Sequence, residues 1–459
     1  MSFHLLSAPR REAPAVVDEG GRTLNYGELD ERVTQSAAFL RSRGERQLGA
    51  LFSSNRLESL VAYLAALRAG HVPILLPQGM PEPLQQELLR TYAPAWTMGT
   101  GLGDERLPGS GIDLQWAETD ADAPALHPDL GLLLSTSGTT GSARLVRLSL
   151  AAVQANAESI AQYLQLGEGE RTVTTLPPSY SYGLSVLNSH LLAGGCLVLS
   201  EHSVLSREFW DLCEQQRPTS LAGVPATHQM LQRAGIGQKA LPSLRTLTQA
   251  GGALGDKLAA SMCALSAERG WRFFVMYGQT EATARISYVP PEQLARKLGS
   301  IGVAIPKGEL SIDSATGELV YRGPNVMMGY ASSRAELALG DELGGVLRTG
   351  DLGHCDDDGF FHVTGRLKRF VKLAGNRIGL DEVERGLQRS MDLPVSASGR
   401  DDRLVVWVEG EGAPLASRAE TWVRETYGLH RSLFRVSCVP RLPLLANGKK
   451  DYRPLLETT

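Results

Sequence analysis

The stretch Leu133–Leu148, LLSTSGTTGSARLVRL, changes abruptly from an apolar run to small and hydroxyl-bearing residues. This pattern predicts a β-strand that ends in a phosphate-binding loop. Glycines would let backbone N–H groups converge on an anion, the hydroxyls would add donors, and Arg144 would add positive charge. Such a cluster alone is also typical of a surface loop. The residues expected to hold phosphate are Thr136, Ser137, Gly138, Thr139, Thr140, Gly141 and Arg144.

This loop is not of the GxxxxGK[ST] type, because no Gly-Lys pair follows its two glycines. Its function therefore has to be judged from the rest of the chain. The 459 residues are enough for two or three domains with a large buried core. A net charge of −4 argues against nucleic acid as the main partner.

Five scattered cysteines without a CxxC pair indicate neither a disulfide framework nor a zinc site. They suit a reducing compartment. The N-terminus lacks an adequate apolar signal region, and no run of 18 or more apolar residues follows. We expect a cytoplasmic protein without a membrane span.

Segments with helical and strand periodicity alternate along most of the chain, which indicates parallel βαβ units. Beyond Gly299 the pattern changes to short strands and turns, including a hairpin about residues 314–317, and the tail contains an expected helix at 380–387 and strand at 403–408. We predict an α/β fold. It comprises a large N-terminal domain of layered βαβ sheets plus a β-rich subdomain (residues 1–367), and a small, mobile α+β lid domain (residues 368–459).

Four further motifs follow the loop in the chain: YGQTEA at 277–282, RTGDLG at 348–353, GRLKRFVKLAGNR at 365–377 and LPLLANGKK at 442–450. Together with the loop they resemble the adenylate-forming superfamily of acyl-CoA synthetases, peptide-synthetase adenylation domains and luciferases. In that family the loop reads S/T-S-G-T-T-G-x-P-K, so Ala143 and Arg144 replace Pro and Lys. Arginine keeps the charge but offers a planar fork to phosphate.

The resemblance implies activation of a carboxylic acid by ATP and Mg²⁺ to acyl-AMP and pyrophosphate, followed by transfer to a thiol. It assigns Tyr277 to the adenine, Thr280 to the α-phosphate and Glu281 to Mg²⁺, a role that suits a carboxylate. Gly251 and Gly278 are further expected nucleotide-site positions. Taken alone, YGQTEA is more typical of a capped helix start with Thr280 and Glu281 solvated, and the phosphate loop upstream reverses that preference.

The later motifs resemble the family's ribose-binding motif, its domain hinge and the C-terminal motif that carries its catalytic lysine. Asp351, expected in a tight Gly-flanked turn, would accept hydrogen bonds from the ribose diol, and Arg366 would reach ribose or phosphate. Lys368 matches the hinge about which the lid turns between half-reactions, and Gly375 matches the glycine of the pantetheine channel. Lys449 matches the catalytic lysine that bridges carboxylate and α-phosphate, although Lys450 is its immediate neighbour.

The loop LPPSYSYGLSVLNSHLLAGG at 176–195 bears on the acid. Amino-acid-activating relatives carry an Asp where this chain has Gly183, and a buried ammonium without a counter-charge is unfavourable. We therefore expect a fatty or aryl acid rather than an α-amino acid. The expected pocket residues are Tyr180, Tyr182, Gly183, His228, Gly251 and Gly302. For His228 a purely structural hydrogen bond is an equal alternative.

Nothing in the sequence decides between CoA and the phosphopantetheine of an acyl or peptidyl carrier protein as the thiol. An amine or oxygen acceptor also stays open. The alternative from a different class is a binding protein that keeps the fold without catalysis. Since Glu281 and Lys449 are both present, we rank the enzyme ahead.

Overall fold

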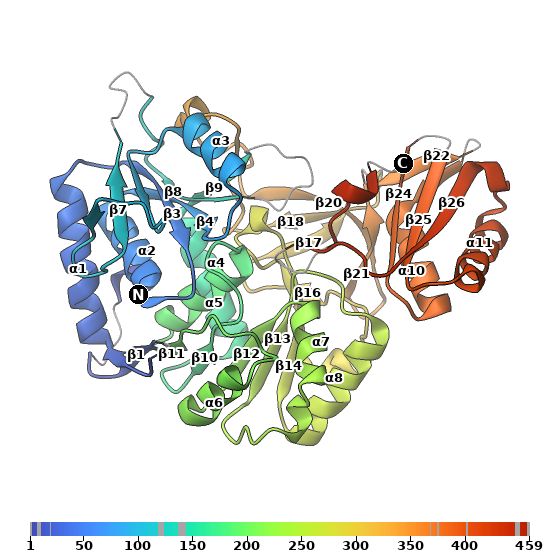
Figure 1. Ribbon diagram of the computed structural model, residues 1–459, viewed down its shortest axis with the longest axis horizontal. Coiled ribbons are helices and arrows are strands. Elements are labelled where there is room, and N and C mark those ends of the chain that lie inside the picture. The colour runs from blue at the N-terminus through green and yellow to red at the C-terminus, as the bar shows by residue number, and fades with distance from the viewer. Residues whose placement is uncertain are drawn as a thin grey trace. The chain divides into compact units, whose positions relative to one another are not determined.

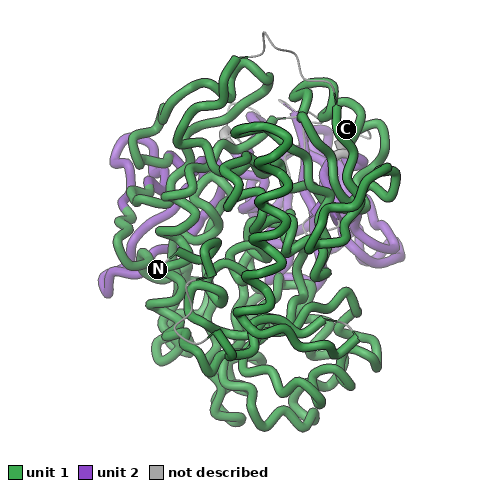
Figure 2. The backbone as a smooth tube through the Cα atoms, turned by 90° about the vertical axis from the view of Figure 1, so that its left-hand side faces the viewer, with its two compact units in different colours: residues 1–310, 321–347 green, residues 311–320, 348–459 purple. Residues whose placement is uncertain are grey.

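The computed structural model describes residues 2–6, 11–18, 20–117, 124–135, 144–367, 369–373, 376–400, 403–445 and 450–456. It divides into two compact units (Figure 2), residues 1–310 with 321–347 and residues 311–320 with 348–459. The predicted domain boundary after residue 367 stays a prediction. None of the helices in these described ranges has the length and hydropathy to cross a membrane.

The first unit contains a nine-stranded sheet, whose inner strands are parallel and whose edges are antiparallel (Figure 1). The parallel core confirms the βαβ pattern expected from the sequence. In sheet order the described strands are β16 (Val303–Ala304), β15 (Ser287–Val289), β14 (Arg272–Tyr277), β13 (Thr246–Gln249), β12 (Ser220–Gly223), β10 (Arg171–Val173), β11 (Cys196–Val198), β1 (Pro14–Val17) and β2 (Thr23–Asn25).

A second sheet in this unit has eight strands in its described part, with β3, β4, β5 and β8 paired in parallel. Alternate side chains of β3 enter different cores, since Ala50 and Phe52 pack on one face and Leu51 on the other. The order is β19 (Gly329–Ala331), β9 (Leu145–Ser149), β8 (Leu130–Ser135), β4 (Val72–Pro77), β3 (Leu48–Ser53), β5 (Trp96–Met98), β7 (Asp113–Trp116) and β6 (Glu105–Arg106).

Helices connect and cover these two sheets. The largest core joins apolar residues of both sheets with α1, α2, α4 and α5, so these helices fix the sheets to one another. Helix α1 begins at a capping box made by Asn25 and Glu28. The helices are α1 (Tyr26–Ser42), α2 (Leu57–Ala69), α3 (Glu82–Tyr92), α4 (Leu150–Leu164), α5 (Ser181–Leu192), α6 (Arg207–Gln216), α7 (Pro225–Arg233), α8 (Asp256–Arg269) and α9 (Pro291–Leu294).

The second unit contains most of a four-stranded sheet made by β17 (Glu309–Ile312), β18 (Glu318–Arg322), β20 (Val346–Cys355) and β21 (Phe361–Arg366). The expected hairpin about residues 314–317 is confirmed between β17 and β18. The rest is a two-stranded ribbon, β22 (Phe370–Leu373) and β23 (Asn376–Gly379), and a sheet of β24 (Val395–Arg400), β25 (Arg403–Glu409) and β26 (Phe434–Val439). Helices α10 (Leu380–Met391) and α11 (Ala413–Tyr427) share an apolar core with this sheet, and α12 (Arg453–Leu456) follows.

Candidate active site

The expected phosphate loop connects β8 and β9, which pair antiparallel with Ser135 opposite Leu145. Residues Thr136–Gly141 lie outside the described residues. Arg144 follows the loop and is exposed, and its guanidinium lies 3.5 Å from the centre of the Tyr330 ring. This cation–π contact holds the expected phosphate-binding cation on β19.

Arg147, the second arginine after the loop, has a structural role. It is fully buried and pairs with Glu342, and it donates hydrogen bonds to the backbone carbonyls of Tyr330 and Gly340 at 3.0 and 3.1 Å. These contacts hold β9 against β19 and the segment that follows it. The charge of Arg147 is therefore paired with Glu342 within the first unit.

The YGQTEA motif occupies the end of β14 and a short 3-10 helix, Thr280–Ala282. Thr280 Oγ1 lies 3.2 Å from Ser181 Oγ, and the Gln279 amide donates to the Tyr277 hydroxyl at 3.1 Å. No side chain caps the helix start. The capped-helix alternative is thus not what this segment forms, and the three polar side chains follow directly on a buried strand, where α/β sheets place ligands.

Glu281 is half-buried and accepts a hydrogen bond from the Tyr330 hydroxyl at 2.8 Å. Burial, followed by the charge of Glu281, raises the pKa of Tyr330, so this phenol stays protonated and can donate. Tyr330 therefore contacts both Arg144 and Glu281. The sequence analysis did not identify it, because it lies 49 positions from Glu281 and has no local motif.

The motif is held in shape by Asn325, a second residue that sequence analysis missed. Its side-chain amide donates to the carbonyls of Ala282 and Arg285 at 2.7 and 2.9 Å, while Tyr321 donates to its oxygen at 2.8 Å. Gly278 also fits closely here, since a Cβ at this position would lie 1.8 Å from the carbonyl oxygen of Ala284. The position thus requires glycine for packing.

The residues present fit a magnesium ion bound together with a nucleotide. Among the described residues no group of three or more His, Cys, Asp or Glu side chains could hold a metal ion. Mg²⁺ usually takes one or two carboxylates and completes its shell with phosphate oxygens and waters. Glu281 supplies such a carboxylate beside Tyr330, so it would hold the ion jointly with nucleotide phosphates.

Two tyrosines of the expected acid pocket lie together at the start of α5. The rings of Tyr180 and Tyr182 are 6.4 Å apart, and the Tyr182 hydroxyl is 2.9 Å from Thr248 Oγ1. Burial raises the pKa of Tyr180 to about 12, so both phenols are neutral near pH 7. Gly251 has φ +84°, and a Cβ there would lie 2.3 Å from the Tyr180 hydroxyl. This glycine allows the close approach of Tyr180.

Gly183 and Gly302 are enclosed by backbone. A Cβ at Gly183 would lie 2.3 Å from the carbonyl oxygen of Pro177, and one at Gly302 would lie 1.9 Å from that of Tyr288. Close packing therefore accounts for both glycines within the first unit. The absence of an Asp at position 183 reflects this packing as well as any preference for the acid.

His228 is fully buried on α7, where its Nε2 lies 3.1 Å from the carbonyl oxygen of Thr248. Burial lowers its pKa to about 4, so the ring is neutral near pH 7. It packs 5.4 Å from the Phe273 ring. These contacts are those of the structural alternative raised from the sequence.

In the second unit, Asp351 and Arg366 face each other across β20 and β21 and form an ion pair of 3.3 Å between Oδ1 and Nε. Asp351 is buried, whereas Arg366 is exposed. The tight turn expected around Asp351 is wrong. The preceding Gly350 has φ +73°, but the chain continues as the long strand β20, in which the Gly350 amide donates to Glu318 at 2.9 Å.

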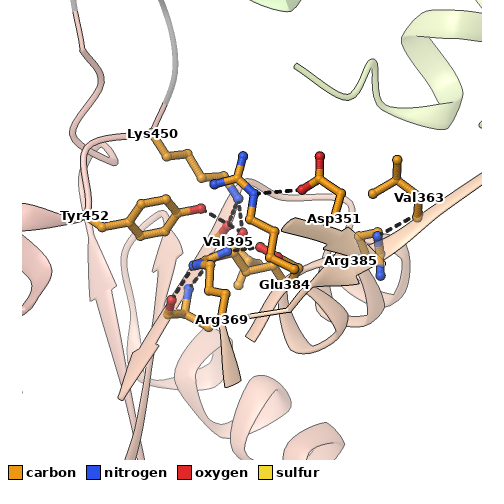
Figure 3. A network of polar contacts seen from close by, with 11 residues as sticks. Asp351, Val363, Arg369, Glu384, Arg385, Val395, Lys450 and Tyr452 are labelled. Atoms are coloured by element: carbon orange, nitrogen blue, oxygen red, sulfur yellow. Dashed lines mark hydrogen bonds and ion pairs between the residues drawn. The ribbon is translucent and has the colours of Figure 1, made fainter. Parts of the chain in front are cut away.

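Lys368, Gly375 and Lys449 lie outside the described residues. Their neighbours in sequence Arg369 and Lys450 both bind one buried carboxylate, Glu384 of α10 (Figure 3). Arg369 Nη2 and Lys450 Nζ each lie 2.6 Å from Glu384, and Tyr452 donates to it at 3.2 Å. We call Arg369, Glu384, Lys450 and Tyr452 the Glu384 cluster.

The Glu384 cluster distinguishes the two adjacent lysines. Lys450 Nζ also donates to the carbonyl of Val395, and Lys450 forms a β-bridge with Leu444. Its ammonium is therefore engaged inside the second unit. This leaves Lys449 as the lysine for the catalytic assignment, which remains a prediction.

Comparison with known proteins identifies the family of this chain. The family model of AMP-binding enzymes matches residues 6–331. The indoleacetate–CoA ligase of Aromatoleum aromaticum is 30% identical over 95% of this chain and 94% of its own length. The feruloyl-CoA synthase of an Amycolatopsis species is 30% identical over 94% and 93%.

A solved structure shows the same fold. The crystal structure of ATP-bound MatB from Rhodopseudomonas palustris superposes with a TM-score of 0.81 and 23% identity, covering 100% of this chain and 99% of that one. The match of the family model covers most of the chain and includes the phosphate loop and YGQTEA. The protein belongs to the family of AMP-binding enzymes.

Proposed function

We propose that this enzyme activates a fatty or aryl carboxylic acid with ATP and transfers the acyl group to the thiol of CoA. In the first step the carboxylate attacks the α-phosphate, and acyl-AMP forms as pyrophosphate leaves. In the second the thiol, after losing its proton, attacks the acyl carbon, and AMP leaves with the bond electrons. The products are a thioester, AMP and pyrophosphate.

The observation that carries this proposal is the arrangement about Glu281 in the first unit. Arg144, which follows the phosphate loop, and Glu281, the expected Mg²⁺ ligand, both contact Tyr330. Thr280 contacts Ser181, which is the sequence neighbour of Tyr180 and Tyr182. These contacts, together with the sequence adjacency of Thr280 to Glu281 and of Ser181 to the two tyrosines, support a common site for phosphate, metal and acid.

The roles proposed for the remaining residues are those that the family resemblance implies. Thr280 would donate to the α-phosphate, Asp351 would accept from the ribose diol with Arg366 beside it, and Tyr277 would lie against the adenine. The ammonium of Lys449 would stabilise the charge that gathers between carboxylate and α-phosphate. Lys368 would serve as the hinge and Gly375 would line the thiol channel.

CoA is the acceptor in the proposal because two relatives of nearly full coverage are named as a CoA ligase and a CoA synthase. The alternative acceptor is the phosphopantetheine of a carrier protein, which presents the same thiol arm. Both acceptors leave the first half-reaction unchanged. Only the second half-reaction, transfer to the thiol, distinguishes CoA from a carrier protein.

The test is pyrophosphate release with ATP and Mg²⁺ across fatty, aryl and α-amino acids, with and without CoA. We expect sustained release only with a fatty or aryl acid and CoA together. Acid-dependent exchange of pyrophosphate into ATP that CoA leaves unchanged would favour a carrier protein. Preference for an α-amino acid, or no acid-dependent exchange, would refute the proposal.

A further inference from the structure

Arg285, just after the YGQTEA motif, is buried without a complementary charge. Its exposed fraction is 2%, and its Nε and Nη1 atoms have no hydrogen-bond partner within the described residues. None of the carboxylates in that part of the chain forms an ion pair with it. Guanidinium groups remain charged in proteins and have donors but no acceptor. A buried one with free donors is therefore unfavourable unless a ligand supplies the acceptor.

Aromatic side chains surround this guanidinium. Its central carbon lies 3.9 Å from the centre of the Tyr182 ring. Aromatic contacts of this kind stabilise the cation and hold its plane, but they leave N–H groups free for an anion. The neighbouring Tyr180 ring is 6.4 Å from that of Tyr182. Arg285 thus lies beside both tyrosines of the expected acid pocket.

The two residues before Arg285 adopt a backbone conformation that is unusual for residues other than glycine. Thr283 and Ala284 both have positive φ, +56° and +106°, although neither is glycine. The turn is held by Asn325, which donates to the Arg285 carbonyl at 2.9 Å, and by Thr283, which donates to the Asn325 carbonyl at 2.5 Å. Strain of this kind persists where surrounding contacts enforce it, often at ligand sites. The hydrogen bonds of this turn therefore hold the backbone of Arg285 in place despite the strain.

We propose that Arg285 binds an acidic group of the substrate, distinct from the carboxylate that reacts with ATP. The preferred acids would then carry a second carboxylate, or a group of equal charge, at the end that enters the pocket beside Tyr182. This inference rests on the proposed function, because it takes Tyr180 and Tyr182 as pocket residues. It makes Arg285 the residue that sets substrate class.

The proposal explains why the guanidinium is unpaired in the protein alone. Binding the second acidic group supplies the missing acceptors and counter-charge, and charge-assisted hydrogen bonds are stronger than neutral ones. An acid that lacks the second group leaves the buried donors unsatisfied, and sites built to hydrogen-bond a substrate discriminate strongly against such analogues.

The experiment compares matched acids, such as hexanoate with adipate and phenylacetate with benzene-1,4-diacetate. Acid-dependent exchange of pyrophosphate into ATP is measured for the wild type, Arg285→Met and the control Arg233→Met, which changes an exposed arginine of α7. We expect the wild type to prefer a diacid. Arg285→Met should lower the ratio of kcat/KM for the diacid to kcat/KM for the matched monoacid by about 10- to 100-fold, and leave the KM for ATP unchanged.

Two results would overturn the inference. One is a wild type that prefers monoacids, with a rank order that Arg285→Met does not alter. The other is a raised KM for ATP with every acid, which would place the nucleotide phosphates on Arg285. If Arg285→Met does not fold, Arg285→Lys keeps the charge and should retain the diacid preference at reduced affinity. Loss of the diacid preference in this folded variant would overturn the inference in the same way as the first result.

Calorimetric titration with the same acids separates this inference from the proposed function. If the wild type catalyses no exchange with any acid, the proposed function fails. Diacid binding that disappears in Arg285→Met would still support the acidic-group site. Exchange without any dependence of acid binding on Arg285 would support the function and refute the site.

Discussion

Replacement of Lys450 by Met tests the energetics of the Glu384 cluster in the second unit. Glu384 is 5% exposed and accepts four hydrogen bonds, from Arg369, Lys450, Tyr452 and the Ala397 amide. Burial alone raises the pKa of Glu384, but the charges of Lys450 and then Arg369 outweigh it and lower the pKa below its ordinary value. Lys450→Met keeps most of the aliphatic stem and removes one of the two charges.

The expected loss follows from the burial of the pair. Removing one partner of a buried ion pair costs about 3–5 kcal/mol. Because the Lys450 side chain is 25% exposed, solvent screens part of this interaction. Arg369 also remains beside the carboxylate, so we expect about 2–4 kcal/mol. That is a large share of the stability of a domain of this size.

Native-state hydrogen exchange measures this loss locally. The Ala397 amide donates to Glu384 at 2.7 Å and reports opening of the second unit. The control is Arg431→Met, which breaks the 3.5 Å pair with Glu420 in the same unit, where the side chains of Arg431 and Glu420 are 81% and 33% exposed. It should cost about 0–1 kcal/mol. Equal, small effects of the two variants would refute the reasoning.

Two further predictions concern the first unit. Gly302 and Gly299 have nearly equal φ, +82° and +81°, but a Cβ would lie 1.9 Å from the Tyr288 carbonyl oxygen at the first and within 4 Å of nothing at the second. Because of backbone strain, Gly299→Ala should lower the free energy of unfolding by about 1 kcal/mol. Gly302→Ala should lower it by at least about 2 kcal/mol more, because the added Cβ also clashes. Denaturant unfolding measures both values, and equal losses would contradict the packing argument. Burial lowers the pKa of His228 from 6.5 to about 4. At pH values between these two, the unfolded chain binds a proton that the folded chain does not, so the free energy of unfolding decreases as pH falls through this window. His228→Gln should flatten the dependence of unfolding free energy on pH by up to about 1.4 kcal/mol per unit; identical slopes for the wild type and His228→Gln would argue against a buried neutral ring.

The regular elements were predictable because their signals are local. The parallel strands, the hairpin about residues 314–317 and the helix that begins at Leu380 follow from periodicity and turn residues. Asp351 was placed in a turn because Gly350 suggested one. The positive φ of Gly350 is real, but β18 and β21 pair with the chain on both sides and continue it as a strand.

The candidate site was predictable only where a motif carries it. Tyr330 and Asn325 contact YGQTEA from segments more than 40 positions away, and single tyrosines and asparagines carry no sequence signal. Arg285 was missed because its burial comes from tertiary packing on Tyr182. Gly183 was interpreted as a substrate signal, which stays a prediction; the nearby Pro177 carbonyl, which leaves no room for a side chain, is a tertiary reason for glycine that the sequence did not show.

The most direct test of the central claim separates the two half-reactions in Lys449→Ala. Adenylation is measured as acid-dependent exchange of pyrophosphate into ATP, and transfer as thioester formation from acyl-AMP supplied with CoA. The account predicts that exchange falls by about 100-fold or more, while transfer from acyl-AMP continues near the wild-type rate. Equal loss of both half-reactions, or exchange at the wild-type rate, would contradict it.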